Sequence, residues 1–131
     1  MATNYNGWKQ KRAEFQLPMT ATFTQTQRED GKFVAHALEF DLVAVANSEE
    51  EATDKIRLAV KIYIEFGLSK GWEDDILFPA PQESWNRLTP DSAISLAAPI
   101  EINDHRPSRR VFLMRAESAH GETRRPALQA V

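Results

Sequence analysis

Three side chains suited to acid–base or metal chemistry lie close together in the sequence: His36, Glu39 and Asp41. A histidine beside a carboxylate can act as a general base, because its pKa lies near neutral pH. The two carboxylates could instead hold a divalent metal for hydrolysis, but such a site needs further carboxylates from other segments, and none is evident. Structural or partner-contact roles are therefore favoured, and we expect neither catalysis nor a cofactor.

Three aromatic residues are candidates for contact with a partner. Phe40 lies between the two carboxylates, and Trp72 and Trp85 fall in connecting segments. A tryptophan in such a segment either covers the edge of a core or anchors a partner, and core packing is the favoured role. Together with His36, Glu39 and Asp41, these aromatic residues belong to the predicted partner-binding set.

Basic residues gather near the end of the chain. From Arg106 onward there are six arginines against two glutamates, whereas residues 1–105 have ten Lys and Arg against seventeen Asp and Glu. Arg106, Arg109 and Arg110 could contact phosphates, or they could contact a protein partner or a second subunit. Since no aromatic residue is interleaved with them, selective binding of single-stranded nucleic acid has little support.

Period-two alternation predicts the strands that position His36, Glu39 and Asp41. Met19, Ala21 and Phe23 alternate with threonines, as in a strand with one buried face. Asp30-Gly31 favours a tight hairpin turn, after which residues 32–38 return as a second strand. Residues 42–46 predict a third, short strand. The cluster at 36–41 therefore lies where the second strand ends and the third begins.

A long helix is predicted next. Ser48 and Glu51 have the spacing of a capping box, and the acidic run around them suits a helix N-terminus. Apolar side chains recur at intervals of three and four, and Ile62 and Phe66 are interpreted as widening the stripe that faces the sheet. Gly67 is expected to end the helix, which then spans about residues 49–66.

The remainder of the chain gives weaker signals. Ile76-Leu77-Phe78 predicts a short fourth strand, ended by Pro79. From residue 89 the apolar residues fit short strands or helical turns, and only residues 111–114 look ordered, either adding to the sheet or packing on another subunit. Residues from about Ala119 are expected to be disordered.

These elements predict an α+β fold, with a three- to four-stranded antiparallel sheet in β-β-β-α-β order packed on one long helix. The 131 residues fit an N-terminal arm (1–13), one domain (14–90) and an irregular, partly disordered C-terminal extension (91–131). No apolar run could cross a bilayer and no secretory signal is evident, so we expect a cytoplasmic protein. The absence of cysteine excludes disulfides and thiolate chemistry.

Two short motifs resemble the HicB-like antitoxin family. Members commonly have D-G-x-Y/F-x-A in a strand and T-x-E-E-A at the start of a helix. Residues 30–35, Asp-Gly-Lys-Phe-Val-Ala, are similar to the first motif, and residues 48–52, Ser-Glu-Glu-Glu-Ala, are similar to the second with serine for threonine. The resemblance covers residues 18 to 68. The helix-turn-helix or ribbon-helix-helix module that family members usually append is not evident after Trp85.

The resemblance implies an incomplete RNase H-like fold, often dimeric and without known catalysis, whose partner is a small RNA-cleaving toxin. We therefore interpret the chain as a non-catalytic protein-binding module of HicB-like antitoxin type, forming a homodimer or a higher homo-oligomer. Two alternatives stay open. One is a divergent RNase H-like hydrolase, whose side chains at 36, 39 and 41 would have to converge within metal-binding distance. The other is a nucleic-acid-associated protein that uses the C-terminal arginines.

Overall fold

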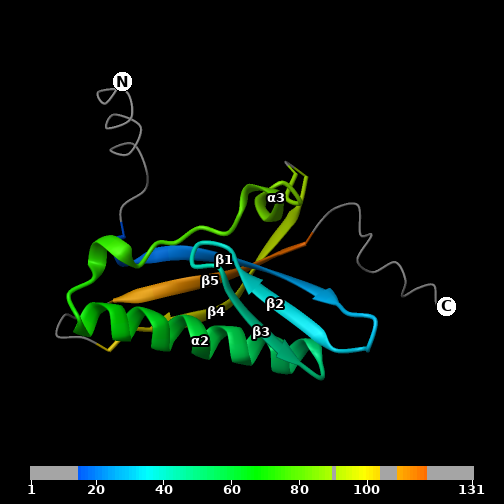
Figure 1. The fold of residues 1–131 in the computed structure, drawn as a ribbon, viewed down its shortest axis with the longest axis horizontal. Helices are drawn as coiled ribbons and strands as arrows, with labels where there is room; N and C mark the ends of the chain where they lie inside the picture. Colours follow the sequence, from blue (N-terminus) through cyan, green and yellow to red (C-terminus); the bar gives the residue numbers. More distant parts are fainter. Residues whose placement is uncertain (1–14, 90, 104–108, 118–131) are drawn as a thin grey trace.

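The structure, a computed structural model, describes residues 15–89, 91–103 and 109–117. It is an α+β fold in which one five-stranded sheet lies against one long helix (Figure 1). The elements, in chain order, are β1 (Met19–Gln27), β2 (Phe33–Ala37), β3 (Leu42–Ala46), α2 (Glu49–Ser69), the 3-10 helix η1 (Glu73–Asp75), α3 (Gln82–Trp85), β4 (Ala93–Glu101) and β5 (Arg110–Glu117).

The first three strands form the antiparallel meander that the alternation predicted. Phe23 pairs with Ala37 between β1 and β2, and Ala35 pairs with Ala44 between β2 and β3. The hairpin turn depends on Gly31, whose φ of +89° lies in the left-handed region that glycine adopts without strain. The meander places His36 at the end of β2, and Glu39 and Asp41 in the loop that follows it.

The helix begins as the capping residues predicted. The Ser48 hydroxyl accepts a hydrogen bond from the Glu51 N–H at 3.1 Å, and the Glu51 carboxylate accepts one from the Asn47 N–H at 3.0 Å. The predicted end is wrong, because Gly67 is an internal helical residue. A Cβ there would lie 2.8 Å from Cγ1 of Ile76, so this glycine permits close packing instead of ending the helix.

The predicted fourth strand is also wrong. Residues 76–81, all of them described, form no strand. Ile76 is buried against the helix, while the Phe78 and Ala80 N–H groups donate to the carbonyls of Glu39 and Leu38 at 3.0 and 2.8 Å. The segment is therefore held by the turn after β2, and it leads to α3 on the side of the sheet away from α2 (Figure 1).

Two later strands complete the sheet, in the order β3-β2-β1-β5-β4. β5 pairs with β1 in parallel, with Ala21 opposite Leu113, and β4 pairs with β5 antiparallel. The sheet is therefore mixed and five-stranded, not antiparallel with three or four strands. The prediction of an irregular C-terminal extension is wrong for both strands, whereas the predicted arm at 1–13 and the predicted disorder from Ala119 lie outside the described residues.

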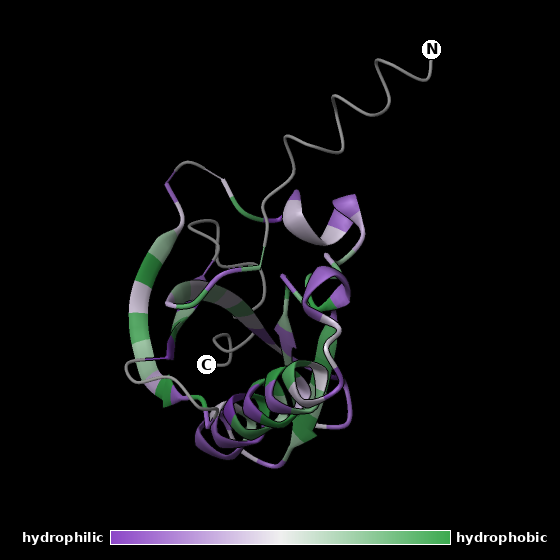
Figure 2. Ribbon diagram, turned by 90° about the vertical axis from the view of Figure 1, so that its left-hand side faces the viewer, coloured by the Kyte–Doolittle hydropathy of each residue, from purple (hydrophilic) through white to green (hydrophobic). Residues whose placement is uncertain are grey.

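The core lies between the helix and one face of the sheet. Small residues on that face, such as Ala35 and Ala37, let the helix approach closely, and Val111 and Leu113 of β5 are equally buried. Figure 2, which looks along the helix, shows β4 as a curved strand at one margin of the sheet. None of the helices within the described residues is long and apolar enough to span a lipid bilayer.

Candidate partner-binding surface

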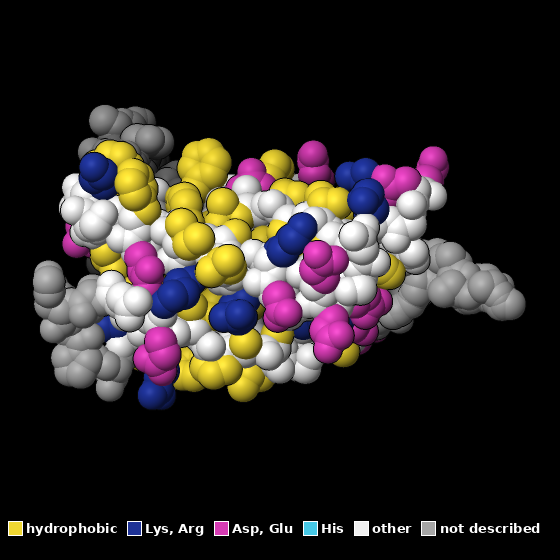
Figure 3. Space-filling model, turned by 90° about the horizontal axis from the view of Figure 1, so that it is seen from below, with side chains coloured by type: hydrophobic (Ala, Val, Ile, Leu, Met, Phe, Trp, Pro, Cys, Tyr) yellow, Lys and Arg dark blue, Asp and Glu magenta, His cyan; other side chains and the backbone are white. Residues whose placement is uncertain are grey.

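A row of large apolar side chains lies on the outer face of α2. Leu58, Ile62 and Phe66 follow one another at intervals of four residues, so they lie along one side of the helix. Their exposed fractions are 50%, 56% and 52%. We call these three residues, together with Trp72, the apolar ridge. Figure 3 shows hydrophobic side chains gathered over the C-terminal half of the helix.

Trp72 extends the ridge beyond the end of the helix. The chain turns at Gly71, whose φ is +72°, and the Trp72 N–H donates to the Gly67 carbonyl at 2.9 Å. This turn brings the indole edge-on against the Phe66 ring, with 5.6 Å between ring centroids, while the Lys70 ammonium lies 5.4 Å from the same ring. Trp72 remains 50% exposed, so the ridge ends in an accessible pair of aromatic rings.

Acidic residues precede and follow the ridge along the chain. Glu49, Glu50 and Glu51 form the first turn of α2, and Glu73, Asp74 and Asp75 form η1 just after Trp72. Lysines and arginines lie between these two groups. Among them, the Lys61 ammonium forms an ion pair with Glu65 at 2.8 Å and donates a hydrogen bond to the Glu101 carbonyl. Desolvation works against ionisation of Glu65, yet hydrogen bonds from Lys61 and the Asn103 N–H hold its pKa below the usual value.

His36 and Asp41 are brought together, as their spacing suggested. His36 Nε2 lies 2.7 Å from Asp41 Oδ1, and both side chains are partly exposed. The contact depends on the backbone of Asp41, which has a φ of +54° and so turns its carboxylate back toward β2. The pair is a two-residue contact at the end of the sheet.

Glu39 does not join that pair. Its carboxylate accepts a hydrogen bond from the Thr22 N–H at 2.6 Å. Burial raises the pKa of Glu39, and the hydrogen bonds from Thr22 only partly oppose the shift. No group of three or more metal-ligating side chains occurs among the described residues. The geometry therefore lacks the convergence that the hydrolase alternative requires.

Two of the predicted aromatic contacts have structural roles. Phe40 is only 2% exposed and packs on Tyr63 with 5.6 Å between ring centroids, so its assignment to a binding surface is wrong. Trp85 is half-buried, and its Nε1–H donates to the Ala80 carbonyl at 3.1 Å. Trp72 is the predicted aromatic that remains on an open surface.

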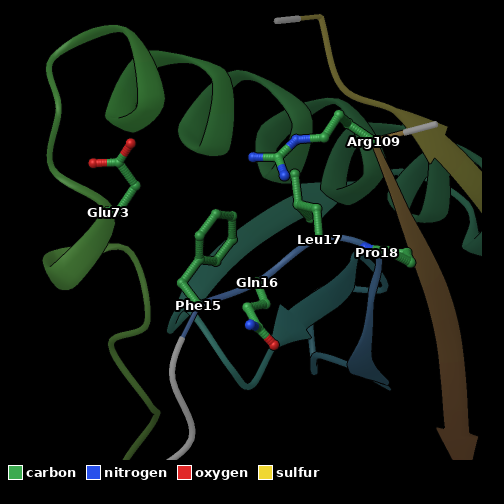
Figure 4. A pocket seen from close by; sticks show the side chains of 6 residues that line it. All are labelled: Phe15, Gln16, Leu17, Pro18, Glu73 and Arg109. Carbon is green, nitrogen blue, oxygen red and sulfur yellow. The ribbon is translucent and has the colours of Figure 1, made fainter. Parts of the chain in front are cut away.

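Two of the three predicted arginines, Arg109 and Arg110, lie within the described residues. Arg106 lies outside the described residues, and Arg110 pairs with Glu101 of the neighbouring strand at 2.7 Å. Arg109 lines a shallow cavity of about 510 Å³ with Glu73 and Phe15 (Figure 4). This placement gives no support to a shared phosphate-binding surface.

The sequence interpretation missed the ridge because it assigned Ile62 and Phe66 to the buried stripe. A helical period could have separated them, since the buried positions Ile56, Val60 and Ile64 lie on the opposite side from Leu58 and Ile62. The chain matches no protein-family model, no curated protein and no solved structure. The surface must therefore be interpreted from its own chemistry.

Proposed function

We propose that this protein is a non-catalytic protein-binding module of HicB-like antitoxin type, which covers a small basic partner with the apolar ridge. The observation that carries the proposal is that four large apolar side chains are each at least half exposed in one continuous row. A soluble protein rarely exposes a contiguous apolar surface of this kind unless a partner covers it.

Burial of the ridge would supply useful binding energy. Removing the exposed half of each side chain from water is worth roughly 1 kcal/mol. Phe66 and Trp72 already hold one another in place, so little conformational freedom would be lost on binding. Aromatic residues at such positions commonly dominate the binding energy of an interface.

The charge distribution favours a basic partner. Residues 1–105 have an excess of seven acidic side chains, and acidic triplets form the first turn of α2 and the helix η1. Complementary charge speeds association and discriminates against acidic proteins. A small RNA-cleaving toxin is basic enough to bind RNA, so the chemistry agrees with the partner that the HicB-like resemblance implies. The element order β1-β2-β3-α2 is the order that the HicB-like resemblance implies for this part of the chain. A cytoplasmic location belongs to the same proposal.

The test is a capture experiment from native lysate with the full-length chain. Wild type should retain a small basic protein in stoichiometric amount, and Ile62→Lys should lose it. Val43→Thr is the matched control, because Val43 is equally exposed but lies on β3. The purified partner should cleave RNA when free and stop when wild type is added. A partner held equally by Ile62→Lys, or one without RNA-cleaving activity, would contradict the proposal.

A further inference from the structure

β4 is the last strand of the sheet in the described part of the chain, and half of it is open to solvent. Residues 93–97 are all exposed, including Ile94 at 59% and Leu96 at 56%. Ile94 lies opposite Ala116 and Leu96 opposite Met114, so both side chains point away from α2. Figure 2 shows hydrophobic colouring along most of this strand.

The two edges of the sheet differ in how they are protected from further pairing. At the β3 edge, the Lys55 ammonium donates to the Val45 carbonyl at 3.1 Å. The second half of β4 has a bulge between Leu96 and Ala98, followed by Pro99. Charged side chains, bulges and proline are the usual means of preventing edge pairing. Residues 93–96 have none of them, which leaves this segment open to another strand.

The order of side chains in this segment is close to symmetric. Ala93-Ile94-Ser95-Leu96-Ala97 has serine at its centre, a large aliphatic residue on each side and alanine beyond. In an antiparallel pair with a two-fold axis at Ser95, Ile94 of one copy would lie opposite Leu96 of the other, and alanine opposite alanine. Such self-complementarity is what a two-fold interface requires.

The charges are compatible with the same pairing. Residues 92–100 include no charged side chain. With the axis at Ser95, the paired segment ends before Pro99, and it brings no two acidic residues together. A partner of strong charge would find no complement along this strand, whereas a second copy meets no repulsion.

We propose that β4 pairs with β4 of a second copy, antiparallel about Ser95, to form a continuous sheet across two chains. The ridge on α2 stays outside this contact, so each copy keeps its own partner-binding surface. The segment is short compared with interfaces that bury about 800 Å² per partner, so we expect a weak dimer whose fraction rises with protein concentration.

Two measurements test this pairing. Light scattering over a range of concentrations should show a dimer for wild type and a monomer for the double variant Ile94→Lys with Leu96→Lys. Ile62→Lys should remain dimeric, which separates this proposal from the proposed function. Circular dichroism verifies that each variant is folded. A chain that stays monomeric up to several hundred micromolar, or a dimer that survives the two lysines, would overturn the proposal.

Cross-linking tests the register. The chain has no cysteine, so Ser95→Cys introduces a single thiol that the two-fold axis places opposite its own copy. Mild oxidation should yield a covalent dimer from Ser95→Cys. Ala93→Cys should cross-link only when it is mixed with Ala97→Cys. Failure of Ser95→Cys to cross-link in a dimeric protein would overturn the register about Ser95.

Discussion

The two faces of α2 have almost the same residue types in opposite environments. Ile56 and Ile64 on the inner face are fully buried against the sheet, whereas Leu58 and Ile62 on the outer face are half exposed. Both rows have a spacing of four residues, so spacing alone does not distinguish core from binding surface. The position of the sheet therefore makes one row structural and leaves the other row exposed.

The largest expected effect separates the two rows by stability. Ile64→Ala should lower the free energy of unfolding by about 3 kcal/mol, because it removes buried methyl groups and leaves a cavity. Ile62→Ala should change it by no more than about 0.5 kcal/mol. Urea denaturation of both variants measures this difference. Similar losses in the two variants would show that the outer row also holds the fold.

A smaller effect is expected where the inner face is most crowded. Gly67→Ala places a Cβ 2.8 Å from Cγ1 of Ile76, which is buried and has little room to move. The free energy of unfolding should fall by about 1 kcal/mol, because overpacking outweighs the better helix propensity of alanine. Ser69→Ala, at the exposed end of the helix, is the control. Stabilisation by Gly67→Ala would show that Ile76 moves freely.

Two partly buried carboxylates differ in how their surroundings shift the pKa. Burial raises the pKa of Glu39, so the folded state binds this proton more tightly and stability falls as pH rises from the unfolded to the folded pKa. For Glu65, hydrogen bonds outweigh desolvation and lower the pKa, so its contribution is present above the unfolded pKa and is lost as pH falls through the folded pKa.

The stabilities of the variants Glu39→Gln and Glu65→Gln should therefore change in opposite directions with pH. Relative to wild type, Glu39→Gln should become more stable as pH rises from about 3 to about 7, and Glu65→Gln should become less stable over the same interval. Urea denaturation at several pH values gives both differences. Parallel curves for the two variants would contradict the assigned environments.

The first half of the fold could be predicted because its signals are local. The alternation in β1, the turn at Gly31 and the cap at Ser48 each depend on neighbouring residues. The pairing of β5 with β1 joins Leu113 to Ala21, more than ninety residues away, and no local pattern encodes it. β4 was obscured because Pro99 and the bulge after Leu96 interrupt its alternation.

The candidate site was predictable only in part. A carboxylate close to His36 was expected from the spacing, but the sequence left Glu39 and Asp41 open as its partner, and the structure places Asp41 there. Phe40 was misassigned because polar neighbours in sequence conceal a side chain that points into the core. The ridge was missed because Ile62 and Phe66 are apolar and were grouped with the buried stripe, although the helical period places Ile62 opposite Val60 and Ile64.

We propose that the outer row of α2 binds a protein while the inner row holds the fold. Calorimetric titration of the captured partner into wild type, Ile62→Lys and Val43→Thr tests it most directly. We predict that Ile62→Lys keeps its stability and binds at least about thirtyfold more weakly, because it loses about 1 kcal/mol of apolar burial and also places an ammonium group in the contact, while Val43→Thr binds normally. Equal affinities for all three proteins would contradict the claim.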